Sequence, residues 1–237
     1  MPLSERIIFN GHELSSQVPG AHVIEITVGD ISMEHNTQQR ISSPGSIFAS
    51  KRDGTRTISI QIELPFDKEG AIINYNLLRA WAETNQPAPL YLPNRTNGYI
   101  NCIISSVSNM NIKTWYEPVS LTFVAYDPYF YGVTQTADCD ETFRVSGDAD
   151  ADFVLTKQND AAIVNPSWLI DGTQHISFTG TIGAGLLTID SSKGLAQLGN
   201  QSVMALLNYE TRFTPLAPGT HTLTGSGGSI SWIERWR

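Results

Sequence analysis

Apolar and polar residues alternate with a period of two over much of the first half of the chain, and this pattern predicts strands with one buried face. The clearest alternation runs from Thr57 to Leu64. The strands predicted in this half are Arg6 to Asn10, His22 to Val28, Thr57 to Leu64, Leu90 to Leu92, Tyr99 to Ser108 and Val119 to Ala125.

One stretch, Glu69 to Thr84, has a helical period instead. Its apolar residues fall at three- and four-residue spacings, the pattern of a helix with one buried face; they are Ile72, Ile73, Leu77, Ala80 and Trp81. Asp67 is the predicted N-cap, and Pro87 with Pro89 prevents the helix from continuing. One helix among many strands indicates an α+β fold, mostly antiparallel β, for this half.

The alternating stretch that begins at Val119 ends in an aromatic cluster, Y-D-P-Y-F-Y-G. Asp127-Pro128 stops the strand because proline has no N–H for the ladder. We interpret the four aromatic residues from Tyr126 to Tyr131 as a plug and Gly132 as a hinge, because the composition changes after it. The predicted domains are residues 1–132 and 133–237.

The second half contains short strand-like runs and no predicted helix. Turn signals recur at roughly 8–12 residues, the spacing of an antiparallel β-sandwich. Val203 to Leu207 is predicted as a strand because Asn200 and Asn208 bracket it too tightly for a helix. The runs are Asp152 to Thr156, Ala161 to Val164, Ile176 to Thr179, Leu186 to Asp190, Val203 to Leu207, Thr220 to Thr224 and Ile230 to Trp236.

Two motifs, one in the middle of the chain and one at its C-terminus, resemble the distal tail proteins of siphophages. The first is D-P-Y-F-Y-G, and the second is the C-terminal stretch from Phe213, F-x-x-L-x-P-G-x-H-x-L, followed by a glycine-rich turn and a last strand that ends in R-W. The resemblance implies an α+β domain that closes into a homohexameric ring and a galectin-like β-sandwich that lies outside it. Locally, Pro218-Gly219 forms a tight turn, while Leu223, Ile230, Trp232 and Trp236 are expected to fill one sandwich face.

The resemblance also implies a function and partners. The ring would be a structural component of the virion tail tip that joins the tail tube to the tip or baseplate and leaves a channel for DNA. Its partners would be further copies of itself, the tail tube protein, the tape measure protein and tail-tip, baseplate or receptor-binding proteins. DNA would pass through without specific binding, nothing would insert into a membrane, and synthesis would take place in the host bacterial cytoplasm.

Charge and cysteine content agree with that interpretation. The 237 residues carry a formal charge of −8, which argues against nucleic-acid binding driven by phosphate contacts. No apolar run approaches the roughly 18 residues needed to span a bilayer, and the N-terminus lacks the layout of a signal peptide. Cys102 and Cys139 are in no metal-ligand spacing, so we expect free, partly buried thiols and a reducing compartment.

The chain shows no recognisable catalytic motif. Asp148, Asp150 and Asp152 alternate like the start of a calcium loop, but Phe153 and Asn159 replace the glycine and glutamate that such a loop requires. We interpret the acidic stretch from Asp138 to Asp160 as a solvated, flexible surface. No enzyme activity, catalytic residue, metal or cofactor is expected.

An alternative function is a carbohydrate-binding module that recognises a bacterial surface glycan through the second domain. Galectins bind sugar through a W-x-x-E-x-R strand, whereas Trp232, Glu234 and Arg235 have another spacing. Asn165-Pro166 also lacks the flanking histidine and arginine of the galectin motif. These departures argue against a sugar site of that kind. Mass in solution separates the two functions, because a hexamer favours the ring and a glycan-binding monomer favours the module.

The stretch from Ser42 to Arg56 is predicted to be a turn-rich loop, with Pro44-Gly45 and Asp53-Gly54 as its turns. Its basic residues form the densest basic cluster of an acidic chain. It is either an ordinary hairpin tip or an arm that docks on a neighbouring subunit, where an apolar anchor beside arginines is a common hot spot. The candidate interface residues are Ile47, Phe48, Lys51, Arg52 and Arg56, with Phe48 as the anchor.

Overall fold

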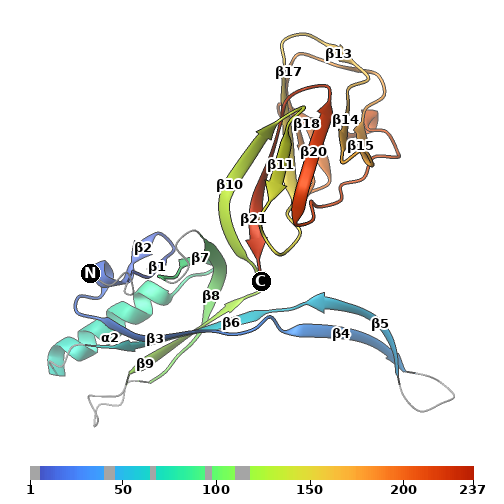
Figure 1. The fold of residues 1–237 in the computed structure, drawn as a ribbon. Coiled ribbons are helices and arrows are strands. Elements are labelled where there is room, and N and C mark those ends of the chain that lie inside the picture. Colours follow the sequence, from blue (N-terminus) through green and yellow to red (C-terminus); the bar gives the residue numbers. More distant parts are fainter. Residues whose placement is uncertain (1–5, 40–45, 65–67, 94–97, 110–117) are drawn as a thin grey trace. The chain divides into compact units, whose positions relative to one another are not determined.

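The computed structural model describes residues 6–39, 46–64, 68–93, 98–109 and 118–237. The chain divides into two compact units, residues 1–130 with Arg237 (unit 1) and residues 131–236 (unit 2). Both consist mainly of antiparallel strands, as expected (Figure 1). The predicted boundary followed Gly132; the two units divide between residues 130 and 131, and Gly132 lies inside strand β10 (Phe130–Asp138).

Unit 1 contains an antiparallel sheet with strand order β3-β6-β9-β8-β7-β1-β2. Its centre is β6 and β9, whose alternation buries every second side chain, as the pattern predicted. The strands are β1 (Ile8–Phe9), β2 (His12–Glu13), β3 (His22–Val28), β6 (Arg56–Glu63), β7 (Ala88–Tyr91), β8 (Tyr99–Val107) and β9 (Val119–Ala125).

The predicted helix is present as α2 (Lys68–Ala82), and a short helix that was not predicted, α1 (Leu14–Gln17), contacts it. Helix α2 contributes Leu78, Trp81 and Ala82 to the core. The Trp81 ring lies 5.8 Å from that of Phe9 in an edge-to-face arrangement, and its indole N–H donates to the His12 carbonyl at 2.9 Å. The predicted N-cap, Asp67, lies outside the described residues.

The predicted buried face of this helix was wrong in four of its five positions. Only Trp81 lies in the core, whereas Ile72, Ile73, Leu77 and Ala80 are exposed. The exposed fraction reaches 59% for Ile73. The physical reason is that periodicity identifies an apolar stripe but does not say what covers it.

The stretch predicted to be a loop is largely a strand. Residues of β5 (Ser46–Asp53) pair antiparallel with β4 (Met33–Gln39) from Met33 opposite Asp53 to Gln39 opposite Ser46. Among the described strands these two pair only with each other, and they form a two-stranded arm of unit 1 (Figure 1). The polar character of β4 and β5 misled the prediction, because a ribbon exposed on both faces needs no apolar alternation.

Unit 2 contains two larger sheets. The first has the order β19-β18-β17-β12-β21-β10, and the second has the order β11-β20-β14-β15. A short pair, β13 with β16, completes the unit. The strands are β11 (Thr142–Val145), β12 (Phe153–Asn159), β13 (Ile163–Val164), β14 (Ser167–Ile170), β15 (Gln174–Ser177), β16 (Thr181–Ile182), β17 (Gly185–Asp190), β18 (Leu195–Leu198), β19 (Gln201–Ser202), β20 (Gly219–Gly225) and β21 (Ser229–Trp236).

The two sheets of unit 2 share one core, which makes the unit a β-sandwich. Phe143 on β11 faces Trp232 on β21 with ring centroids 4.7 Å apart, and Trp168 on β14 lies edge-on to Phe178. Leu223, Ile230 and Trp232 are buried as expected, whereas Trp236 is only half-buried and does not belong to this core.

Two further predictions for unit 2 need correction. The predicted strand at Val203 to Leu207 is a 3₁₀ helix, η2 (Met204–Leu206), in which Leu206 N–H donates to the Val203 carbonyl at 3.0 Å. The acidic stretch is solvated as predicted, since Asp148 and Asp150 are exposed, but it contains strands and its aspartates alternate with buried residues such as Ala149 and Ala151. No helix among the described residues is long and apolar enough to cross a membrane.

Candidate assembly surface

The β4–β5 arm carries the residues that the sequence analysis named as a subunit interface. Phe48, Lys51 and Arg52 lie on β5 and are exposed, and Phe48 keeps 59% of its surface in contact with solvent. The Phe48 ring lies 5.9 Å from the His35 ring on β4, which covers it only in part. Ile47 also belongs to β5, but its side chain is outside the described part of the chain.

The charge of Arg52 is matched within the arm. Its Nε donates to Glu34 Oε2 at 2.6 Å, and the two side chains are 80% and 49% exposed. Such a surface ion pair contributes about 0–1 kcal/mol to stability. Arg52 would therefore contribute less to a contact with another subunit than a cation without an ion pair. Phe48 remains the stronger candidate anchor of the arm.

Arg56 does not belong to the exposed part of the arm. It begins β6 opposite Ala125, and only 5% of it is exposed. Its guanidinium carbon lies 5.2 Å from the centre of the Phe130 ring, a cation–π arrangement within unit 1. The prediction that Arg56 is exposed on the arm failed because it placed this residue in a loop. Arg56 instead belongs to β6 and shares its inward face with Ile58 and Ile60.

The base of the arm is closely held. Gly54 N–H donates to the Ser32 carbonyl at 2.7 Å, and Thr55 N–H donates to Ser32 Oγ at 2.7 Å. A Cβ atom at position 54 would lie 2.5 Å from Ser32 Oγ, so any larger residue here would have to displace that hydroxyl group. The two strands of the arm are thus joined where they meet the sheet.

A carboxylate beside this base is also fixed. The Tyr129 hydroxyl donates to Asp53 Oδ2 at 2.6 Å. This hydrogen bond outweighs partial burial and holds the pKa of Asp53 below its ordinary value. Burial, together with the same hydrogen bond, raises the pKa of Tyr129.

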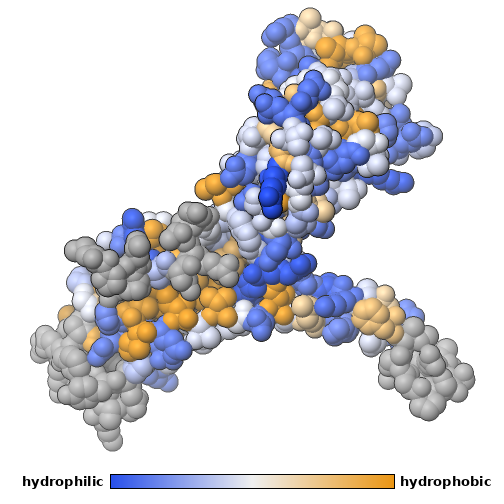
Figure 2. All heavy atoms as spheres, viewed as in Figure 1, coloured by the Kyte–Doolittle hydropathy of each residue, from blue (hydrophilic) through white to orange (hydrophobic). Residues whose placement is uncertain are grey.

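A second exposed surface of unit 1 is the apolar stripe of helix α2. We call Ile72, Ile73, Leu77 and Ala80 the α2 stripe. Three of them recur at intervals of one helical turn, and apolar side chains gather over this region in Figure 2. A contiguous exposed apolar patch of this kind is typical of a protein–protein contact.

Strand β3 lies at the edge of the unit 1 sheet and pairs only with β6 among the described strands. None of its residues is fully buried, and Ile24 is half exposed. An edge strand offers unpaired N–H and C=O groups to another chain. In the described part of unit 1, the uncovered features therefore include the arm, the α2 stripe and the β3 edge.

Sequence reasoning missed the α2 stripe as a surface because it assigned these residues to the core. A signal was present, since α2 is apolar on a second face as well, through Leu78, Trp81 and Ala82. A helix on the surface of a single unit needs only one apolar face. A helix with two apolar faces therefore has one face more than the described core of its own unit covers.

Comparison with known proteins identifies the fold. No family model and no curated protein sequence matches the chain. Among solved structures, the SPP1 Dit protein matches with a TM-score of 0.79 at 14% identity, and the match covers 98% of this chain and 99% of Dit. Dit is described as a paradigm of the hub adsorption apparatus in phages that infect Gram-positive bacteria. A chain of the phage P2 baseplate in its activated conformation matches with a TM-score of 0.50 at 9% identity, covering 94% and 92% of the two chains.

The similarity to Dit extends over both units, so it is not limited to a single common sandwich or sheet. At these identities the similarity concerns the fold. The predicted resemblance to siphophage distal tail proteins is thereby confirmed, and this chain has the fold of the phage hub protein Dit.

Proposed function

We propose that the chain is a structural component of a phage tail tip, in which six copies close into a ring that joins the tail tube to the tip or baseplate. The observation that carries this proposal is the match to Dit over 98% of the chain. Unit 1 would form the ring around a channel for DNA, and unit 2 would be a galectin-like sandwich outside it. The role involves no catalysis, cofactor or membrane insertion.

The uncovered surfaces of unit 1 support self-assembly. A ring needs heterologous contacts, in which one surface of a subunit binds a different surface of the next. The arm and the α2 stripe are two such different surfaces within one unit. Phe48 is 59% exposed, so covering its exposed part would contribute roughly 1–2 kcal/mol per subunit, which is enough to make it an anchor.

The proposed partners beyond the ring are the tail tube protein, the tape measure protein and baseplate or receptor-binding proteins. We place the protein at the virion tail tip after synthesis in the host cytoplasm. On the arm, Lys51 would lie at the rim of a contact and orient it toward acidic groups, which an acidic chain with a formal charge of −8 supplies.

The first experiment measures mass in solution. Six chains of 26.0 kDa give about 156 kDa, and analytical ultracentrifugation over a dilution series should show this species dissociating by mass action. A truncated chain that ends at Gly132 should still assemble. A full-length chain that stays monomeric at every concentration contradicts the ring and favours the glycan-binding alternative.

The second experiment tests the arm. Phe48→Ala should weaken the oligomer more than Arg52→Ala, because Phe48 is exposed and Arg52 is already paired with Glu34. Neither variant should change the melting temperature of the dissociated chain. If Phe48→Ala instead lowers that melting temperature strongly, the side chain serves its own subunit and the arm is an ordinary hairpin.

A further inference from the structure

A pocket of about 380 Å³ lies on the outer face of the larger sheet of unit 2. Val154 on β12 lies in register between Asp190 on β17 and Ser231 on β21, so these side chains form one row across three strands. The neighbours of Val154 on β12, Phe153 and Leu155, point into the core. The row therefore faces away from the core, and the pocket belongs entirely to unit 2.

The pocket is lined by apolar residues and by polar residues, and we call the polar ones its rim. Val154 and Ile233 are its aliphatic residues, and both are half-buried. The rim provides hydroxyl groups, carboxylates and one guanidinium; these are Thr134, Ser192, Ser231, Asp152, Asp190 and Arg235. A few fixed polar groups around an apolar surface are the usual composition of a small-molecule site, and about 300–1,000 Å³ is the usual size.

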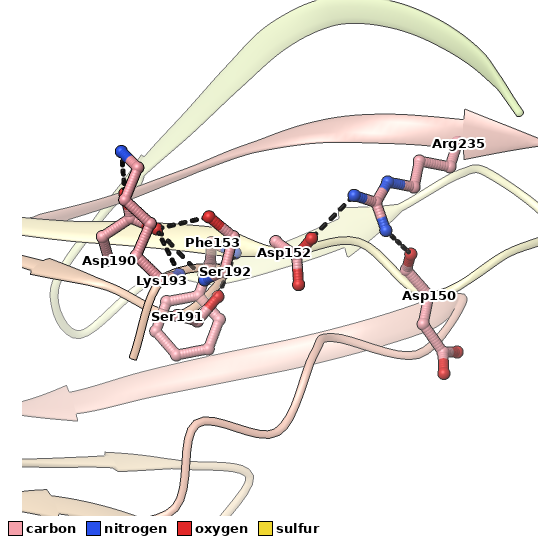
Figure 3. Close-up of polar contacts among 8 residues, drawn as sticks. All are labelled: Asp150, Asp152, Phe153, Asp190, Ser191, Ser192, Lys193 and Arg235. Carbon is pink, nitrogen blue, oxygen red and sulfur yellow. Dashed lines mark hydrogen bonds and ion pairs between the residues drawn. The ribbon is translucent and has the colours of Figure 1, made fainter. Parts of the chain in front are cut away.

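Asp190 is held in place at one end of the pocket (Figure 3). Its Oδ1 accepts hydrogen bonds from Ser192 Oγ at 2.7 Å and Ser192 N–H at 3.1 Å, and Lys193 Nζ donates to its Oδ2 at 2.8 Å. Burial opposes ionisation of this carboxyl, but the hydrogen bonds from Lys193 and Ser192 outweigh it and keep its pKa below the ordinary value. Asp190 is therefore an oriented carboxylate at neutral pH.

Arg235 is held at the other end. Its Nη2 donates to Asp152 Oδ2 at 2.6 Å, its Nη1 donates to the Asp150 carbonyl at 3.3 Å, and its guanidinium carbon lies 5.3 Å from the centre of the Tyr131 ring. In Figure 3 the second carboxylate oxygen of Asp152 makes no contact with the residues drawn. This arrangement fixes the donor and leaves an acceptor that a ligand can use.

We propose that this pocket binds a neutral saccharide of one or two pyranose rings. The two carboxylates are already matched by Arg235 and Lys193, so the pocket has no excess charge that would select an ion. A pyranose offers an apolar C–H face to Val154 and Ile233 and hydroxyl groups, each a donor and an acceptor, to the rim. Oriented acceptors and a fixed guanidinium are suited to hydroxyl pairs.

Other ligand classes fit less well. An anion such as phosphate would meet Asp152 and Asp190, and a metal ion would lack ligands because no three acidic, histidine or cysteine residues in the described segments converge on a site. The pocket also differs from a galectin sugar motif, since it uses Ser231, Ile233 and Arg235 on β21 and not a W-x-x-E-x-R strand. The proposal goes beyond the hub function and does not depend on it.

The test uses the full chain and a panel of free sugars, namely glucose, galactose, rhamnose and N-acetylglucosamine, with glucose 6-phosphate as the charged control. Saturation-transfer NMR should give a saturable signal for at least one neutral sugar, with a Kd of about 0.1–10 mM, typical of a shallow site. If no neutral sugar binds saturably, or only the phosphorylated sugar binds, the proposal is overturned.

Two matched variants locate the binding. Ser231 lines the pocket and its Oγ donates to the Val154 carbonyl at 3.2 Å, whereas Ser229 is on the same strand and bonds Thr156 Oγ at 3.1 Å outside the pocket. Ser231→Phe should weaken sugar binding by about tenfold or more because it fills the site, and Ser229→Phe should change it less than about twofold. Equal effects of the two variants would overturn the assignment.

A third variant distinguishes a loss of binding from a loss of folding. Asp190→Asn keeps the size of the side chain but removes a charged acceptor, and it should weaken binding by about fivefold or more while the melting temperature stays within a few degrees of wild type. Unchanged binding by a folded Asp190→Asn protein would contradict the site. Ultracentrifugation of the same variants should show an unchanged oligomer, which separates failure of the sugar site from failure of the hub.

Discussion

The two units differ in what they do with their large apolar side chains. In unit 2 the two sheets enclose one aromatic-rich core, and the exposed apolar residues are scattered over separate elements; they are Val133, Val164, Leu186, Leu195 and Tyr209. Unit 1 buries a core as well, but it leaves the α2 stripe together on one helix face. Single exposed apolar residues are ordinary, whereas a contiguous stripe requires a cover.

This difference indicates a division of labour. Unit 2 encloses its core and carries polar residues on its outward face, whereas the assembly that we propose would cover the apolar surface of unit 1. Stability of the isolated chain should therefore depend on the core of each unit and not on the stripe or the arm.

The largest effect is expected in the core of unit 2. Trp168 is almost fully buried, and its indole N–H donates to the Gly227 carbonyl at 2.7 Å. Trp168→Ala should lower the free energy of unfolding of this unit by about 3–5 kcal/mol, through a large cavity and an orphaned acceptor. Calorimetry of the full chain would measure it. A loss of less than about 1 kcal/mol would mean that this unit also depends on a partner.

Adjacent residues of α2 give the sharpest comparison within unit 1. Leu78 is fully buried and Leu77 is 40% exposed, although both are leucines on the same helix. Leu78→Ala should lower the free energy of unfolding of the dissociated chain by about 2–5 kcal/mol, and Leu77→Ala by less than about 0.5 kcal/mol. Denaturant titration gives both values.

Leu77, which should add little to the stability of the dissociated chain, should matter for assembly. Leu77→Ser should shift the oligomer toward smaller species without unfolding it, because it places a hydroxyl in a contact that we expect to be apolar. Sedimentation at matched concentrations would detect the shift. Assembly that is insensitive to Leu77→Ser would remove the α2 stripe from the interface and leave it without an assigned cover.

A smaller effect is expected from acid. Because the hydrogen bond from Tyr129 lowers the pKa of Asp53 in the folded chain, the unfolded chain binds the proton more tightly. The contribution of Asp53 to stability is therefore complete above its ordinary pKa of 3.8 and is lost as the pH falls through the lower folded value. Asp53→Asn should reduce the acid sensitivity of unfolding between about pH 5 and pH 2. An unchanged acid titration would show that this bond adds nothing to unit 1.

The smallest effect concerns the two thiols, one in each unit. Cys102 is fully buried, and burial raises its pKa to about 12, whereas Cys139 is partly exposed. A thiol reagent should modify Cys139 rapidly and Cys102 only when unit 1 opens, since the thiolate is the reactive form. Mass spectrometry of the labelled chain would identify the site. Rapid labelling of Cys102 would mean that the core of unit 1 opens easily.

Local pattern was sufficient for most elements. Alternation located β3, β6, β8 and β9 within a residue or two, and the helical period located α2. These elements are visible because their geometry repeats every two or 3.6 residues and half-buried elements must match that repeat. The same logic brought Leu223, Ile230 and Trp232 into the sandwich core.

Elements without that repeat were missed. The arm is polar on both faces, so its strand β5 resembled a loop, and the short apolar run at Met204–Leu206 has no alternation that separates a strand from a 3₁₀ turn. Arg56 shows the consequence for the interface, because it lies on the inward face with Ile58 and Ile60 once strand β6 extends to position 56, where a loop was predicted.

The pocket of unit 2 and the exposed stripe of unit 1 follow from long-range packing. Asp152 and Arg235 are 83 positions apart in the sequence, and their pairing depends on strands β12 and β21 lying side by side. The α2 stripe is exposed because no other described element of unit 1 covers it, although its residues are as apolar as those of a core. Composition and spacing determine which side chains share a face, but only the assembled sheet determines whether that face meets a neighbour, a ligand or water.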